Sequence, residues 1–194
     1  GATVTSSNSL MISTYSGDFI DSGASSFNST TGSISVSAKS ISIGVGSTVG
    51  AKSGIAINAS GSSVQFDGAG MVTTSGAITL QAQTSIVLNG DLTAGTLAAG
   101  PPATAAIVSA GSVSASAGGF SNPGSITIGS GRNIRSAGGN IVMSSTGGVA
   151  IGANNTVRAD GGNISMMTTG AIAGSSGNTF YARATGTASN SAGG

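Results

Sequence analysis

The sequence predicts an all-β fold, a parallel β-helix in which the chain winds into a three-sided β-solenoid of about 23 residues per coil. Two observations carry this prediction. Gly138-Gly139-Asn140-Ile141 returns 23 residues later as Gly161-Gly162-Asn163-Ile164. Short apolar-x-apolar stretches also recur at spacings of 7 or 8 residues, and three such spacings make one 23-residue period. Because side chains alternate between the two faces of a strand, each stretch indicates a short strand and each coil a triangle.

The predicted strands place their inward apolar residues in three columns, one for each side of the triangle. After residue 126 the members are, for the first column, Ile126, Val149 and Ile172; for the second, Ile134, Val157 and Phe180; and for the third, Ile141 and Ile164, with Met143 and Met166 inward on the same strands. Towards the N-terminus the columns continue as Ile12, Ile34, Ile55, Ile78 and Leu97; as Ile20, Ile41, Val64, Ile86 and Ile107; and as Val4, Phe27, Val49, Val72, Leu92 and Val113. About eight coils follow, and at about 4.8 Å per coil the rod is expected to be about 40 Å long.

The chain is expected to form a single β-solenoid domain over residues 1–194, with two departures from regularity. Residues 95–123 break the period and are predicted to be an irregular coil with extruded loops. One loop, 117–123, carries Phe120 at its tip and is either a tolerated insertion or a binding protrusion. Residues 184–194 are predicted to be a flexible or strand-extending tail. No segment shows a helical period with caps.

Stacking in register places equivalent side chains about 4.8 Å apart, so corner asparagines are expected to form ladders. Asn140 is predicted to stack on Asn163, and Asn155 on Asn178.

The same spacing brings charged residues of successive coils together. Arg135 is expected beneath Arg158, a like-charge pair, and Asp160 beneath Arg183, a small favourable pair. All four are expected to be solvated on the outer surface.

The composition offers little for catalysis, metal binding or nucleic-acid binding. There is no His, Cys or Glu, and charged residues make up 6% of a chain with net charge +1. The sequence therefore predicts no catalytic residues, no cofactor and no metal. Its only carboxylates are Asp18, Asp21, Asp67, Asp91 and Asp160. Six dispersed basic residues are too few for a nucleic-acid surface: Lys39, Lys52, Arg132, Arg135, Arg158 and Arg183. No apolar run reaches the roughly 20 residues of a membrane helix.

Several passages resemble the repeats of filamentous-haemagglutinin-type surface proteins: Gly76-Ala77-Ile78-Thr79-Leu80, Ile86-Val87-Leu88-Asn89-Gly90 and Ala159-Asp160-Gly161-Gly162-Asn163-Ile164. The resemblance covers most of residues 30–182. The family consists of large secreted bacterial adhesins with right-handed parallel β-helical shafts. It implies a right-handed coil and an extracellular or cell-surface location. Since the chain has no initiator Met and no signal-peptide pattern, we expect a mature segment of a secreted bacterial protein.

Two functions follow as hypotheses. The first is a structural extracellular protein without catalysis, a shaft or filament subunit that assembles head to tail with itself or with neighbouring solenoid domains. It is favoured because the end coils of a solenoid expose unpaired strand edges. The alternative is an adhesin fragment that binds carbohydrate, or a host or cell surface, through a flat solenoid face or the 117–123 loop. An enzyme is the least favoured class.

Overall fold

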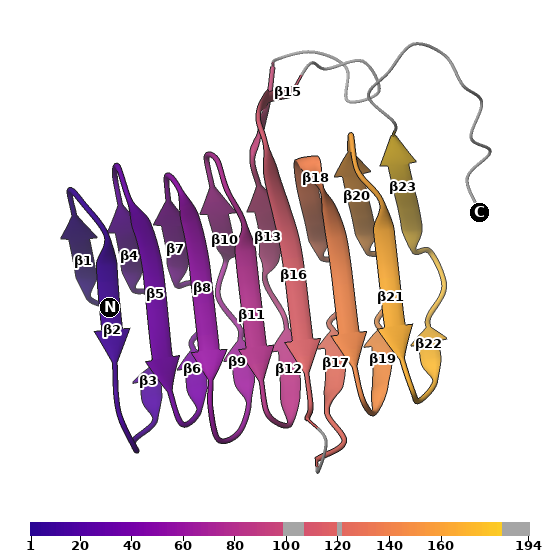
Figure 1. Ribbon diagram of the computed structural model, residues 1–194, viewed down its shortest axis with the longest axis horizontal. Coiled ribbons are helices and arrows are strands. Elements are labelled where there is room, and N and C mark those ends of the chain that lie inside the picture. The colour runs from indigo at the N-terminus through magenta and orange to yellow at the C-terminus, as the bar shows by residue number, and fades with distance from the viewer. Residues whose placement is uncertain (99–106, 120–121, 184–194) are drawn as a thin grey trace.

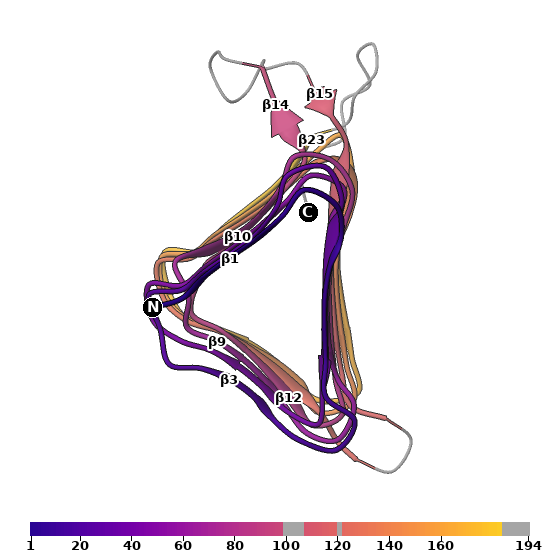
Figure 2. The ribbon, with the colours of Figure 1, turned by 90° about the vertical axis from the view of Figure 1, so that its left-hand side faces the viewer.

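The computed structural model describes residues 1–98, 107–119 and 122–183. In these ranges the chain forms 23 strands and no helix. The strands are wound into a parallel β-solenoid whose coils stack into a rod (Figure 1). Seen along the rod from its N-terminal end, the coils superpose as a triangle (Figure 2). In that view the chain turns clockwise as it recedes from the viewer, which makes the coil right-handed.

Three parallel sheets form the sides of the triangle, and we name them faces A, B and C. Face A contains β1 (Thr3–Ser6), β4 (Ser26–Ser29), β7 (Thr48–Ala51), β10 (Gly70–Thr73), β13 (Asp91–Ala94), the first part of β18 (Asn133–Ser145), β20 (Thr156–Asp160) and β23 (Thr179–Arg183). Face B contains β2 (Leu10–Ser13), β5 (Ser33–Ala38), β8 (Gly54–Ala59), β11 (Ile78–Ala82), β16 (Gly111–Ala117), the second part of β18 and β21 (Ile164–Thr168). Face C contains β3 (Phe19–Asp21), β6 (Ile41–Ile43), β9 (Val64–Phe66), β12 (Ser85–Leu88), β17 (Ser125–Ile128), β19 (Gly148–Ile151) and β22 (Ile172–Gly174). The described chain thus makes about seven turns and then crosses face A once more.

Strands one coil apart pair in register, and this pairing produces the 23-residue period. Ile141 pairs with Ile164, and Val149 pairs with Ile172. Every strand of the three faces therefore hydrogen-bonds to strands of neighbouring coils, along the axis of the rod.

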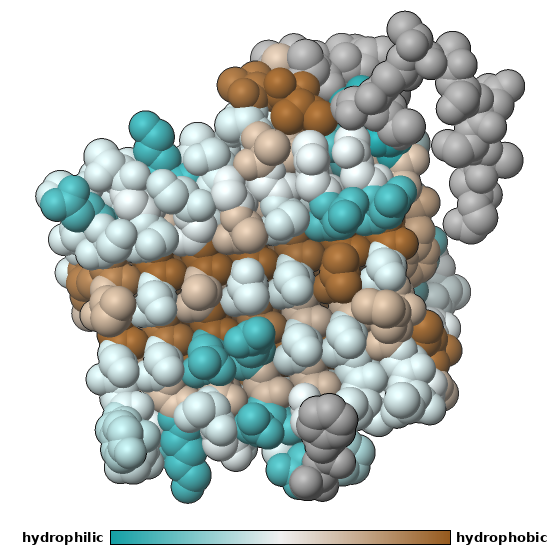
Figure 3. Space-filling view, in the orientation of Figure 1, coloured by the Kyte–Doolittle hydropathy of each residue, from teal (hydrophilic) through white to brown (hydrophobic). Residues whose placement is uncertain are grey.

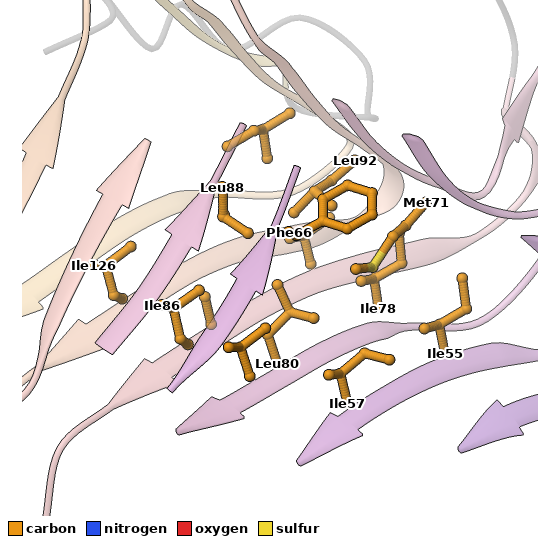
Figure 4. Packing of buried hydrophobic residues seen from close by; sticks show 14 of the residues in the cluster. Ile55, Ile57, Phe66, Met71, Ile78, Leu80, Ile86, Leu88, Leu92 and Ile126 are labelled. Carbon is orange, nitrogen blue, oxygen red and sulfur yellow. The ribbon is translucent and has the colours of Figure 1, made fainter. Parts of the chain in front are cut away.

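The inward side chains fill the axis as one hydrophobic core. Burial alternates strictly along strands such as β5 and β16, as expected when one face of each strand points inward. Figure 4 shows side chains from different faces meeting inside the rod, with Leu80 from face B, Leu88 from face C and Leu92 from face A. All three are fully buried. Complete burial of such a side chain contributes roughly 1.5–3 kcal/mol.

The predicted columns are wrong across the irregular segment. Ile78 was expected to continue into Leu97 and Ile126, but it pairs with Val113. Leu97 and Ile107 were both expected in columns, but they pair with each other in an antiparallel hairpin of β14 (Thr96–Leu97) and β15 (Ile107–Ser109). The other two faces cross this segment through the pairs Leu92 with Ile134 and Ile86 with Ile126. The extra chain leaves the coil at a corner instead of building part of another coil (Figure 2).

Two further positions slip by one residue. Met71, not Val72, points inward on β10, and Val72 is 51% exposed. On β3 the inward residue is Phe19, while Ile20 is 73% exposed. The Phe19 ring packs edge-on against Phe27, with centroids 5.9 Å apart. Adjacent apolar residues satisfy the alternation in either register, so packing decides which one is buried.

Replacing an inward residue should cost far more stability than replacing its outward neighbour. We expect Ile141→Ala to lower the free energy of unfolding by about 2–5 kcal/mol, because Ile141 is fully buried between neighbouring coils. Ser144→Ala, on the outward side of the same strand, should change it by less than about 0.5 kcal/mol. Urea unfolding followed by circular dichroism measures both. Equal losses would contradict the inward and outward assignment of β18.

Candidate assembly interface

The two end coils present strands that are paired on one side. At the N-terminal end β1, β2 and β3 pair with β4, β5 and β6, and in the described part of the chain no strand lies on their other edge. At the C-terminal end the same holds for β23, β21 and β22, which pair with β20, β18 and β19. A parallel strand with one free edge presents backbone groups that can pair with another chain.

The apolar columns are also uncovered at both ends. In the last coil Ile172 is 53% exposed and Phe180 is 47% exposed, whereas their partners one coil earlier, Val149 and Val157, are buried. At the N-terminal end four apolar residues are half-buried and pack against the core from one side: Val4, Leu10, Ile12 and Phe19. Within the described residues, each end is therefore an open cross-section of the hydrophobic core.

The columns predicted after residue 126 lie in register, although their last members are less buried than an internal position. Ile126, Val149 and Ile172 are partners on face C, and Ile134, Val157 and Phe180 on face A. Face B holds the pairs Ile141 with Ile164 and Met143 with Met166. Ile141 and Met143 are fully buried, whereas Ile164 and Met166 are half-buried because no described strand follows β21 on face B.

The predicted asparagine pairs lie at corners, one coil apart. Their amides bond to the backbone of the neighbouring coil: Asn140 Oδ1 accepts from the N–H of Asn163 at 2.8 Å, and Asn178 Oδ1 accepts from the N–H of Asn155 at 2.9 Å. Asn155 is buried, and its own Oδ1 accepts from the N–H of Arg132 at 2.6 Å. These side chains supply hydrogen bonds between coils at the corners of the triangle.

One charged cluster holds the last three crossings of face A together, and Asp160 at its centre is not solvated as expected. Asp160 is fully buried, and Arg158 donates to its two carboxylate oxygens at 2.8 and 2.6 Å. Arg135 and Arg183, from the coils before and after, lie 3.4 and 3.5 Å from the same carboxylate. The Arg158 guanidinium also stacks 5.0 Å from the centroid of the Tyr181 ring. The carboxylate therefore separates arginines that would otherwise repel one another.

A second carboxylate organises the corner at the other end of the rod. Asp21 accepts hydrogen bonds from the hydroxyls of Ser25 and Ser47 and from the N–H groups of Gly23 and Gly44. Burial acts to raise the pKa of Asp21, but these hydrogen bonds outweigh it and hold the pKa below its usual value. Asp21 is therefore ionised at neutral pH.

A polar groove of about 230 Å³ lies on face B beside the start of the 117–123 loop. Its lining side chains include Asn58 and Gln81, which are register partners and exposed, together with Gln83 and Ser116. Figure 3 shows this face as rows of small, mostly pale side chains separated by brown apolar bands, with a hydrophilic patch towards the ends of β8 and β11. None of the described residues that line this groove is aromatic. Phe120, predicted at the tip of the loop, lies outside the described residues.

The β14–β15 hairpin is a protrusion within residues 95–123, where the sequence predicted extruded loops but no antiparallel hairpin. It projects from the corner between faces A and B (Figure 2), and Val108 on it is 65% exposed. The side chains of Thr96 and Ser109 both donate to the carbonyl oxygen of Thr74, which fixes the base of the hairpin. The sequence signal that could have indicated this hairpin is the adjacent apolar pair Ile107 and Val108, which follows Pro101-Pro102. The segment that joins the two strands lies outside the described residues.

Residues 1–98, 107–119 and 122–183 contain no group of three or more potential metal ligands. They also contain no helix long and apolar enough to cross a membrane.

Comparison of the chain with protein-family models, with curated proteins and with solved structures finds no match. The β-solenoid architecture therefore rests on the structure of this chain.

Removing the charge at the centre of the arginine cluster should loosen the last coil. In Asp160→Asn three arginines lose their shared counter-ion, so we expect the opening free energy of residues 179–183 to fall by about 2 kcal/mol or more. Hydrogen exchange of the backbone amides measures this. Asp18→Asn removes an exposed carboxylate at the other end and is the matched control. Unchanged protection of β23 in Asp160→Asn would contradict a holding role for the cluster.

Proposed function

We propose that this protein is a structural, non-catalytic extracellular protein, a β-solenoid shaft or filament subunit whose copies assemble head to tail. The observation that carries the proposal is the pair of open end coils, each with free strand edges on three faces and an uncovered apolar cross-section. Exposed apolar patches of this kind mark interaction surfaces on soluble proteins.

The two ends are suited to each other because they belong to the same three columns. If the first coil of one copy lies on the last coil of another in the internal register, Val4 lies on Phe180 on face A. Faces B and C are crossed seven times and face A eight times, so at this joint Leu10 and Ile164 share a column on face B, and Phe19 and Ile172 on face C, two coils apart. On face A the joint repeats the contact that already holds neighbouring coils of one chain together. Coils of a neighbouring solenoid domain would fit the same ends.

The proposed role is mechanical. Hydrogen bonds between coils run along the rod, so axial load is shared among three strands at each level. Each added coil extends the shaft by about 4.8 Å. Charged residues make up only 6% of the chain, and on the face seen in Figure 3 most outward side chains are small. The resemblance of the repeats to filamentous-haemagglutinin-type proteins supports a bacterial surface location for such a shaft.

A second candidate function is glycan binding by an adhesin fragment, and the polar groove on face B favours it. Exposed carboxamides in register, Asn58 and Gln81, can donate to and accept from sugar hydroxyls. The described residues of the groove provide no aromatic platform on which sugars stack, so we rank this candidate below the shaft. Loss of binding on a glycan array in Asn58→Ala and Gln81→Ala, with retained fold, would reverse that order.

Electron microscopy of the purified chain at rising concentration tests the shaft proposal. We expect unbranched filaments with a subunit repeat of about 38 Å, because eight crossings of face A at about 4.8 Å each make one subunit. A carrier-protein fusion at the N-terminus should block assembly by covering the first coil. Particles that stay monomeric at every concentration would leave only neighbouring solenoid domains as partners for the end coils.

A further inference from the structure

The charged side chains are unevenly divided along the chain. Residues 1–98 carry two lysines and four aspartates, a side-chain charge of −2. Residues 107–183 carry four arginines and one aspartate, a side-chain charge of +3. The remaining positions hold no charged residue, so the two halves account for the net charge of +1.

The solenoid converts this division of the sequence into a separation in space. Each coil lies beyond the previous one along the rod, so position in the chain is position along the axis (Figure 1). Asp18 and Asp21 lie in the corner before β3 and on β3, in the first turn, and Arg158 and Arg183 lie on β20 and β23 in the last. A globular fold would mix these residues, whereas the rod keeps a negative end and a positive end.

Hydrogen bonds and ion pairs hold the charged side chains in place at each end of the rod. Asp18 is exposed and accepts from the Ser40 hydroxyl at 2.6 Å, and Asp21 is held by two serines. At the other end Asp160 is enclosed by three arginines, so the cluster as a whole is positive.

We infer that this axial charge separation steers a second copy of the chain onto the end of the rod and sets the polarity of assembly. The inference rests on the proposed head-to-tail shaft. The negative first coil of one copy meets the positive last coil of another. A contact between two first coils, or between two last coils, brings halves of like charge together. Either contact also prevents the parallel strand pairing that the free edges offer. The partner is therefore another copy, in one orientation.

Ionic strength determines how strongly the charge separation accelerates association. The Debye length is about 30 Å at 10 mM salt, comparable to the rod, and about 8 Å at physiological salt. Steering acts on the rate of association more than on the final affinity. Filament growth should therefore be fastest at low salt and should slow as salt rises, although apolar burial alone would favour the opposite trend.

Two single substitutions separate axial steering from a simple effect of net charge. Lys52→Gln and Arg132→Gln each remove one positive charge and each bring the net charge to zero. Lys52 directly follows β7, two coils from the negative end, and Arg132 directly precedes β18, two coils from the positive end. Neither side chain pairs with Asp160 in the cluster. Lys52→Gln strengthens the axial separation, whereas Arg132→Gln weakens it.

Seeded elongation followed by light scattering in 10 mM salt is the test. We expect Lys52→Gln to elongate at least about twofold faster than the unmodified chain and Arg132→Gln at least about twofold slower, with the difference gone at about 300 mM salt. Thermal unfolding checks that both variants keep the fold. Changes in the same direction, or equal rates for all three proteins, overturn the inference and leave the head-to-tail shaft standing. Absence of filaments from all three overturns the shaft proposal itself.

Discussion

Everything in this molecule depends on the in-register hydrogen bonding between strands one coil apart. Parallel neighbours must offer equivalent residues at equivalent positions, so the chain repeats about every 23 residues and apolar residues line up in columns. The corners obey the same requirement. Asn140 and Asn178 each accept a hydrogen bond from a backbone N–H of the neighbouring coil, which continues the hydrogen bonding between coils at the corners. The core, the corners and the open ends all follow from this one constraint.

The in-register pairing between coils tolerates insertions that project outward from a corner of the coil. On face A, Leu92 pairs with Ile134 across a much longer stretch of chain than a normal coil contains. The surplus is accommodated by the β14–β15 hairpin at one corner and a smaller loop after β16 at another, and the stack continues in register beyond them. Protrusions can therefore be added to such a shaft without loss of its length or stiffness, because only the strands take part in stacking.

Sequence reasoning succeeded where repetition is regular and failed where it is not. The triplets after Ile126 could be aligned because each occupies the same environment one coil later. The spacing of apolar residues cannot distinguish a coil from a hairpin of similar length. Leu97 was therefore predicted in an inward column, although it lies in the β14–β15 hairpin. Alternation cannot choose between adjacent apolar residues such as Met71 and Val72. The burial of Asp160 depends on arginines from three successive crossings of face A, which pairwise spacing does not reveal. The sequence shows that negative charge is concentrated in residues 1–98 and positive charge in residues 107–183. Only the rod-like fold shows that these charges are separated along one axis.

The central claim is that strands at the ends of two copies pair in the same way as strands of neighbouring coils pair within one chain. Cross-linking tests this claim most directly. The chain has no Cys, so introduced thiols are the only ones present. Thr3 and Thr179 are exposed members of the same outward row on face A, at opposite ends of the rod. Neighbouring parallel strands lie about 4.8 Å apart, within the Cα separation that a disulfide spans. The account predicts that Thr3→Cys combined with Thr179→Cys gives a ladder of disulfide-linked multimers on mild oxidation, whereas Thr3→Cys combined with Ser165→Cys, on face B, does not. Equal cross-linking of both pairs, or none in either, would contradict it.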